Sequence, residues 1–231
     1  MISPNHTAVI LCGGRGERLR PLTESIPKPL VNIAGKPILK YLMDHLVSFG
    51  VKRFNIAAGY EGDKIVDFFK SHYLDYSVSI SNIGEADILQ RILACGETIS
   101  SDFSVYYGDT LANIDLNDLY AAHCSCDNMG TMALYPLTSE FGLCKVDANN
   151  KVQSFTEKPT LDYWINIGHF FYQRSALSEM KKYTTHAEYL ASACNSGLLQ
   201  GYRHNGVHIT INTLRELEEA EGNISRFDVW R

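Results

Sequence analysis

The chain has 231 residues, of which 45% are hydrophobic and 20% are charged, and its formal net charge is −5. This composition excludes a largely disordered chain and predicts one sizeable core, or at most two small ones. The mild acidity argues against nucleic acid as a partner, because a protein surface that binds nucleic acid is usually basic. It does not exclude a phosphorylated small molecule, which needs only a few well-placed cations.

The sequence also indicates a compartment. No apolar run approaches the roughly 20 residues that span a bilayer, and residues 1–6 lack the charged and apolar regions of a signal peptide. The six cysteines are scattered, and the close pair Cys124 and Cys126 has no second pair with which to form a zinc site. We therefore expect a cytoplasmic protein with reduced thiols and no membrane partner.

The first half of the chain alternates two kinds of predicted element. Short apolar and β-branched runs predict strands at Thr7–Cys12, Arg53–Ala58, Tyr76–Ser81 and Phe103–Tyr107. Apolar residues at helical spacing predict helices at 37–49, 65–72 and 88–99. This alternation is typical of βαβ units, whose strands form a mostly parallel sheet with helices on both faces.

The alternation of predicted strands and helices ends after Met129. Short strand candidates follow at Thr131–Tyr135, Gly142–Val146, Lys151–Thr156 and Gly168–Tyr172, and helices are predicted near 186–196 and 213–222. The expected fold class is α/β: a Rossmann-like, mostly parallel mixed sheet flanked by helices, with a smaller β-rich elaboration. Residues 1–231 are expected to form a single domain with halves of about 7–128 and 129–231.

A glycine-rich loop follows the first predicted strand, where glycines let backbone N–H groups approach a phosphate. The dinucleotide fingerprint G-x-G-x-x-G is present at Gly14 and Gly16 but fails at Leu19, and the P-loop ending G-K-[ST] is absent. The cations near this loop are Arg15, Arg18, Arg20 and, between two prolines that restrict its backbone, Lys28. Because guanidinium groups bind phosphate oxygens in pairs, the loop predicts a phosphate site. The alternative is a solvated turn with scattered cations.

The segment Leu11–Leu30, read as G-G-x-G-x-R-L-x-P-L-T followed by P-K-P-L, resembles the signature of the sugar-1-phosphate nucleotidylyltransferases. These enzymes join a nucleoside triphosphate to a sugar 1-phosphate. Further similarities extend over about residues 7–215, at Gly35–Ile38, Gly108-Asp109, Phe141-Gly142, Glu157–Pro159 and Ile165–Gly168. Thr213-Leu214-Arg215 is most similar to the glucose-1-phosphate cytidylyltransferase branch, and the heptose-phosphate guanylyltransferases are also near.

The resemblance implies a nucleotide-binding first half and an acceptor-binding second half. The nucleotide would be bound by Leu11, Gly13, Gly14, Gly16, Arg18 and Gly84. The catalytic residues would be Arg18 towards the leaving pyrophosphate, Lys28 on the phosphates, and Lys158 on the acceptor phosphate. The acceptor would be bound by Gly142, Glu157, Lys158 and Asn166. Mg²⁺ would be held by Asp109 and Asn212, and Lys158 is expected to join the loop cations in space. A homodimer is a further expectation by analogy.

Three positions depart from the family pattern. Glu17 stands where Thr or Ser is usual, and its carboxylate would repel a triphosphate unless it points away or pairs with Arg15 or Arg20. Asn212 stands where the second metal-binding aspartate is expected; its amide oxygen can bind Mg²⁺ but carries no charge. Cys12 replaces the usual alanine without a clear consequence.

These departures leave three functions open. The first is an active sugar-1-phosphate nucleotidylyltransferase, with CTP favoured by the C-terminal resemblance only. The second is transfer to a non-sugar phosphate such as phosphocholine, and the third is a non-catalytic nucleotide-binding relative. A purely structural role also stays open for some residues, since Asp109, Gly84 and the Glu157–Pro159 segment are also typical of ordinary turns. His169 and His208 are expected to pack rather than act as bases, because the incoming phosphate is already ionised.

Overall fold

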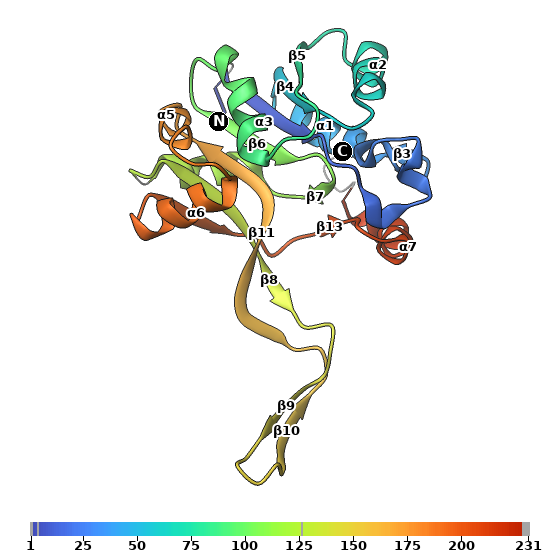
Figure 1. The fold of residues 1–231 in the computed structure, drawn as a ribbon, viewed down its shortest axis with the longest axis vertical. Coiled ribbons are helices and arrows are strands. Elements are labelled where there is room, and N and C mark those ends of the chain that lie inside the picture. Colours follow the sequence, from blue (N-terminus) through green and yellow to red (C-terminus); the bar gives the residue numbers. More distant parts are fainter. Residues whose placement is uncertain (1, 4, 126, 228–231) are drawn as a thin grey trace.

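The computed structural model describes residues 2–3, 5–125 and 127–227, so Cys126 of the close cysteine pair lies outside the described residues. A seven-stranded sheet in the order β12-β8-β11-β6-β1-β4-β5 forms the centre of the body (Figure 1). Its strands are β1 (Thr7–Cys12), β4 (Arg53–Ala58), β5 (Ser77–Asn82), β6 (Phe103–Tyr107), β8 (Gly130–Thr138), β11 (Thr160–Tyr172) and β12 (Leu199–Arg203). β11 runs antiparallel to both of its neighbours, while the other pairings are parallel. The expected α/β class with a mostly parallel mixed sheet is therefore confirmed.

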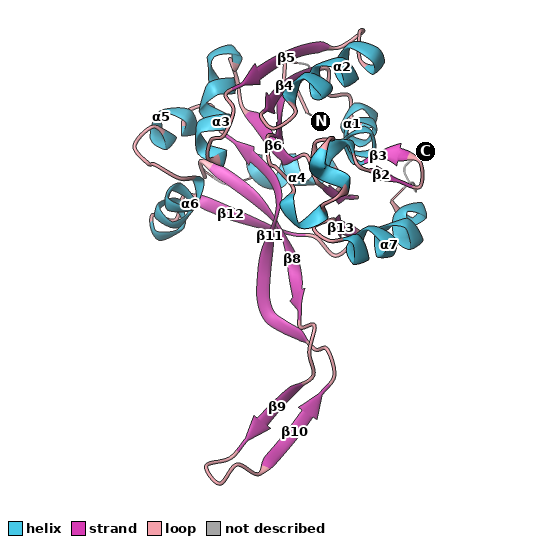
Figure 2. Ribbon diagram, turned by 45° about the vertical axis from the view of Figure 1, so that its right-hand side comes forward, coloured by secondary structure: helices cyan, strands magenta, loops and turns pink. Residues whose placement is uncertain are grey.

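Helices cover both faces of this sheet (Figure 2). One face packs against α1 (Ile38–Ser48), α2 (Gly62–His72), α4 (Leu116–Cys124) and α7 (Leu214–Asn223), and the other against α3 (Ile88–Cys95), α5 (Ala176–Met180) and α6 (His186–Asn195). In the central strand β1, Ala8 and Ile10 enter the first core, whereas Val9 enters the second. A strand buried on both faces needs the continuous apolar run from which it was predicted.

The strands and helices predicted for the first half lie where the pattern placed them, except at the end of one helix. α3 ends at Cys95 and is followed by a single 3₁₀ turn, Gly96–Thr98, so Ile99 is not helical. Glycine disfavours helix continuation, and Ile99 is buried in the same core without it. The elements that the sequence pattern did not reveal are α4, α5, β12 and the short strands β2, β3, β7 and β13.

The strand predicted at Gly168–Tyr172 is the last part of a much longer strand, β11, whose first residues leave the body. Beyond the body, β8 and β11 continue into the hairpin β9 (Leu143–Val146) and β10 (Val152–Thr156), and we call residues 139–163 the arm (Figure 1). Every residue of β9 and β10 is exposed. The exposed large apolar side chains of the arm are Phe141, Leu143, Val146, Val152, Phe155 and Tyr163.

Two short antiparallel ladders lie beside the main sheet. β2 (Asn32–Ile33) pairs with β3 (Lys36–Pro37), and β7 (Thr110–Ala112) pairs with β13 (His208–Thr210). In the second ladder Thr110 lies opposite Thr210, although the two are far apart in sequence. Within the described residues, no helix combines the length and apolarity that crossing a membrane requires.

Several histidines are buried in the body, as expected for His169 and as found also for His6, His45 and His186. Burial lowers the pKa of His6, His45 and His186 to about 4, and that of His169 to about 3, because desolvation penalises the charged imidazolium. These side chains are therefore neutral parts of the core at neutral pH.

We predict that acid weakens the fold between pH 6.5 and 4. An unfolded histidine takes up a proton near pH 6.5, whereas the buried one does so only near the lowered pKa; stability is therefore complete above pH 6.5 and falls as the pH drops through this window. Each histidine can contribute up to about 1.4 kcal/mol per pH unit. Urea unfolding at pH 7.5, 6 and 5 measures the slope.

His45→Gln should reduce this slope, because a glutamine amide can still donate to the Ile114 carbonyl that His45 contacts at 3.0 Å but takes up no proton. His72→Gln, at an exposed position, is the matched control and should leave the slope unchanged. An unfolding free energy that stays constant from pH 7.5 to 5 would contradict the prediction.

Candidate active site

The site lies at the carboxyl edge of the parallel strands. β1 ends at Cys12 and runs into the glycine loop, and β6 ends at Tyr107, directly before Gly108-Asp109. Gly108 donates from its backbone to the Leu11 carbonyl at 3.0 Å, which holds the two strand ends together. Ligands of open α/β sheets bind at this edge, and two adjoining cavities are found here.

The first cavity, of about 360 Å³, is charged. It is lined by Gly14, Arg15, Gly16, Glu17, Arg18, Lys28, Asp109 and Asn212. Gly16 has a φ of +62°, and a Cβ at this position would lie 3.0 Å from Cβ of Lys28, so glycine meets both the backbone conformation and the close approach. The Gly16 carbonyl also accepts a hydrogen bond from Thr23 at 2.8 Å. The loop is thereby held against the Lys28 side chain.

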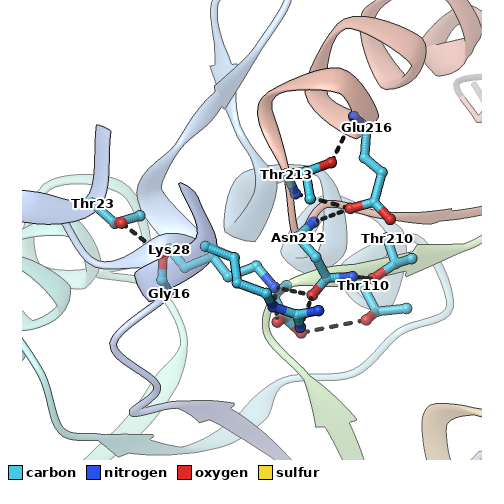
Figure 3. Close-up of polar contacts among 10 residues, drawn as sticks. Gly16, Thr23, Lys28, Thr110, Thr210, Asn212, Thr213 and Glu216 are labelled. Atoms are coloured by element: carbon cyan, nitrogen blue, oxygen red, sulfur yellow. Dashed lines mark hydrogen bonds and ion pairs between the residues drawn. The ribbon is translucent and has the colours of Figure 1, made fainter. Parts of the chain in front are cut away.

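Four polar side chains meet in this cavity (Figure 3). The Lys28 ammonium contacts the Asp109 carboxylate at 2.5 Å and donates to Asn212 Oδ1 at 3.0 Å. Arg18 donates to the same amide oxygen, also at 3.0 Å. Since Lys28 is only 7% exposed, Asp109 supplies the anion that its buried charge requires. The group keeps one positive charge in excess, which suits a polyanionic ligand.

Asn212 is oriented by the elements on either side of it. Its Nδ2 donates to Thr210 Oγ1 at 3.3 Å, so the amide oxygen faces the cations. The backbone N–H groups of Asn212 and Thr213 both donate to Glu216, at 2.5 and 2.9 Å, in the capping box that begins α7. Glu216 was not singled out from the sequence, although the pattern Thr-x-x-Glu is the signature of this cap.

The donor set at this point fits a magnesium ion that also takes ligands from phosphates. Asp109 offers one carboxylate and Asn212 one amide oxygen, and both oxygens already surround a single ammonium. Mg²⁺ is commonly held by one or two carboxylates together with substrate phosphates. Among the described residues no group of three or more His, Cys, Asp or Glu side chains is placed to hold a metal.

The second cavity, of about 340 Å³, is mainly apolar and shares Gly14, Lys28 and Asp109 with the first. Its other lining residues are Leu11, Cys12, Gly13, Pro29, Ala86, Ile88, Arg91 and Tyr107. Burial raises the pKa of Tyr107, and a hydrogen bond with the Asn166 side chain opposes that rise. Because the two cavities share lining residues, a flat, largely apolar group could occupy the second while a phosphate chain attached to it lies in the first. The lining residues that the sequence had not indicated as part of a site are Cys12, Pro29, Ala86, Ile88, Arg91 and Tyr107.

The structure brings most of the predicted nucleotide and metal residues together. Leu11, Gly13, Gly14, Gly16, Arg18, Lys28, Asp109 and Asn212 line one or both cavities, and Asn166 lies beside Tyr107. Gly84, also predicted to bind the nucleotide, lines neither cavity; its carbonyl group accepts a hydrogen bond from Arg91 at 2.7 Å.

The predicted acceptor residues Gly142, Glu157 and Lys158 lie elsewhere, on the arm, which extends away from the body (Figure 1). Lys158 is exposed and does not join the loop cations within its own chain, because β10 and β11 carry the segment between them outwards. The sequence gives no signal for this separation, since the direction of an arm is a tertiary property.

The other two loop arginines form ion pairs outside this group, although Arg15 also lines the first cavity. Arg15 pairs with Glu85 and lies 5.6 Å from the centre of the Tyr60 ring, while Arg20 comes within 4.0 Å of Glu17. The pairing of Glu17 with Arg20 is one of the two arrangements expected to reduce repulsion of a triphosphate. Of the three arginines, Arg18 is the one that contacts Asn212.

Comparison with known proteins adds three findings. The model of the family described as "Nucleotidyl transferase" matches residues 7–213. The "Probable glucose-1-phosphate cytidylyltransferase" of Bacillus subtilis is 33% identical over 92% of this chain and 94% of its own length, and the "Glucose-1-phosphate cytidylyltransferase" of Salmonella typhi is 30% identical over 93% and 94%. A crystal structure of a putative glucose-1-phosphate thymidylyltransferase from Bacillus anthracis aligns with a TM-score of 0.77 at 20% identity, over 97% and 96% of the two chains.

We predict that Asn212→Asp strengthens divalent-metal binding. The new carboxylate adds the charge that the amide lacks, at an oxygen already facing the centre of the group. Calorimetric titration of Mg²⁺ into protein saturated with a non-hydrolysable nucleoside triphosphate should show affinity raised by about tenfold or more. Asn149→Asp, which makes the same charge change at an exposed arm position, is the control. Equal Mg²⁺ affinity in all three proteins would show that position 212 does not contact the metal.

Proposed function

Because this chain belongs to the nucleotidyl transferase family, we propose that it joins a nucleoside triphosphate to a sugar 1-phosphate, releasing pyrophosphate and a nucleoside-diphosphate sugar. The observation that supports this most is the group of Arg18, Lys28, Asp109 and Asn212 beside an apolar cavity at the carboxyl edge of the sheet. Glucose 1-phosphate and CTP are the proposed substrates, since relatives that match nearly the whole chain are named glucose-1-phosphate cytidylyltransferases.

The reaction is attack by an acceptor phosphate oxygen on the α-phosphorus, with pyrophosphate as leaving group. It needs positioning and charge neutralisation more than covalent catalysis, and the ionised acceptor phosphate needs no base. Arg18, at the outer side of the group, would hold the leaving pyrophosphate, while Lys28 would neutralise the reacting phosphates. Mg²⁺, held by Asp109 and Asn212, would supply further positive charge when bound. The backbone N–H groups of the glycine loop would orient the triphosphate.

The apolar cavity would hold the nucleobase. Leu11 and Gly13 form part of one wall, and Ala86 and Ile88 part of the other. Asn166 would reach the acceptor next to this cavity, because it lies beside Tyr107 at the same sheet edge.

The arm would complete the acceptor side of the site in a second copy of the chain. Its hairpin is exposed over its whole length and carries large apolar side chains, with Phe155 62% and Val152 58% exposed. An isolated two-stranded hairpin is marginally stable in water, so these side chains need a partner. We propose a homodimer in which Glu157 and Lys158 of one copy contact the acceptor in the site of the other.

The proposed reaction predicts pyrophosphate release for one pair of substrates. We would measure it with Mg²⁺ over four nucleoside triphosphates and a panel of sugar 1-phosphates together with phosphocholine. CTP with glucose 1-phosphate should give the highest kcat/KM, and Asp109→Ala should remove Mg²⁺-dependent turnover, whereas the exposed Asp118→Ala should not. Turnover with phosphocholine alone, or nucleotide binding without any turnover, would contradict the proposal.

The shared site predicts complementation between two inactive variants. Asp109→Ala and Lys158→Ala should each be inactive alone. In a mixed dimer, the site that retains Asp109 receives Lys158 from the other copy, so mixing and reassociating the two variants should restore part of the activity. If each site used its own Lys158, the mixture would stay inactive. Adding Phe155→Ser, which weakens the apolar arm surface, to both inactive variants provides the control for assembly, because their mixture should then stay inactive.

A further inference from the structure

Arg91, on α3, is a buried cation without an acidic partner. The residue is 6% exposed, and across residues 5–125 and 127–227 no carboxylate forms an ion pair with it. Its guanidinium donates instead to four backbone carbonyls, those of Ala58 at 2.8 Å, Gly84 at 2.7 Å, Gly13 at 3.2 Å and Ala86 at 3.2 Å. Burial lowers the pKa of Arg91, because desolvation disfavours its charged form.

These four carbonyls belong to the ends of three neighbouring strands. Ala58 ends β4, Gly13 directly follows β1, and Gly84 and Ala86 lie in the loop between β5 and α3. A single planar guanidinium, with five donors in fixed directions, thus links three segments at the carboxyl edge.

Two glycines leave the space that the guanidinium occupies. A Cβ at Gly13 would lie 1.8 Å from Arg91 Nη1, and one at Gly59 would lie 2.7 Å from the same atom. Gly13 therefore excludes any side chain as long as Arg91 occupies this place, and at Gly59 the backbone of Gly13, 2.8 Å from such a Cβ, excludes one as well. Gly13, which the sequence indicates as a phosphate-loop glycine, has this second reason to be glycine.

Two of the three segments joined by Arg91 line the apolar cavity. Gly13 lies in the wall that follows β1, Ala86 lies in the opposite wall, and Arg91 itself lines the space between them. The separation of these walls sets which planar group fits, and backbone groups on them are the polar atoms available to a base. Burying a cation that has only carbonyl partners costs free energy of folding. The presence of Arg91 here therefore indicates that the arrangement it makes is needed.

We propose that Arg91 is a positioning residue for nucleobase selection: it fixes the distance between the two cavity walls to which Gly13 and Ala86 belong, and so determines which base the cavity accepts. This inference rests on the proposed function in placing the base in the apolar cavity. It concerns nucleotide binding, however, and can be tested without transfer to an acceptor.

The test compares Arg91→Lys and Arg91→Met with the wild type. We would measure the affinity of the full-length protein for CMP, UMP, GMP and AMP by calorimetry without metal, since monophosphates lack the pyrophosphate that Arg18 would hold. Lysine keeps the charge but cannot reach four carbonyls in the guanidinium geometry. Both variants should reduce the ratio of affinities between the preferred base and the next by at least tenfold. In turnover, the KM for the preferred triphosphate should rise while the KM for the acceptor stays unchanged.

Arg174→Met is the matched control. Arg174 also donates to a backbone carbonyl, that of Ile99 at 3.0 Å, but lines neither cavity, so base discrimination should not change. Arg91→Lys retains the cation and keeps the test available should Arg91→Met fail to fold. Affinities for all four monophosphates that fall in parallel, with their ratios preserved, would overturn the proposal and leave Arg91 a purely structural residue. Absence of pyrophosphate release from the wild type would count against the proposed function alone, because the base ratios are read from binding.

Discussion

The candidate site depends on one short backbone pairing, the antiparallel ladder between β7 and β13. Three residues of β7 pair with three residues of β13, and this places the segment after Asp109 against the segment before Asn212. Without the ladder, Lys28 would be buried beside a single carboxylate with no second acceptor, and Arg18 would lose the amide oxygen that it contacts. Residues from the start, middle and end of the chain therefore form one group because six backbone positions are held in register. The Glu216 cap at the start of α7 then fixes the last of these residues from the other side.

Charge at the carboxyl edge of the sheet is distributed differently from charge in the whole chain. The chain carries a formal charge of −5, yet the group around Lys28 has two cations and one carboxylate, and Arg91 adds a buried cation below the glycine loop. Both places have more positive charge than the protein itself neutralises. An anionic ligand would neutralise this excess of positive charge. Asn212 leaves the excess in place, whereas a carboxylate at position 212 would have reduced it.

Sequence patterns revealed the parts of the fold that have strong local signals. The apolar runs of β1 and β6 gave the central strands, and the proline-flanked Lys28 and the glycine loop gave the charged side of the site. The ladder of β7 and β13 was not foreseen, because three-residue strands have no detectable periodicity. Arg91 was missed for another physical reason: its partners are backbone carbonyls, which every residue possesses, so nothing in the sequence marks them. The outward direction of the arm follows from long-range pairing of β8 with β11, which local pattern does not encode.

β11 belongs to both regions of the molecule. It starts on the arm next to the segment that carries Lys158, enters the main sheet, and places Asn166 beside Tyr107 at the wall of the apolar cavity. Its pairing with β8 shifts register twice, between Thr160 and Trp164 and again between Asn166 and Phe170. One continuous strand thus connects the exposed apolar surface to the cavity, and the second irregularity falls just beyond Asn166. The same strand whose first residues belong to the arm therefore also sets the position of Asn166 beside Tyr107.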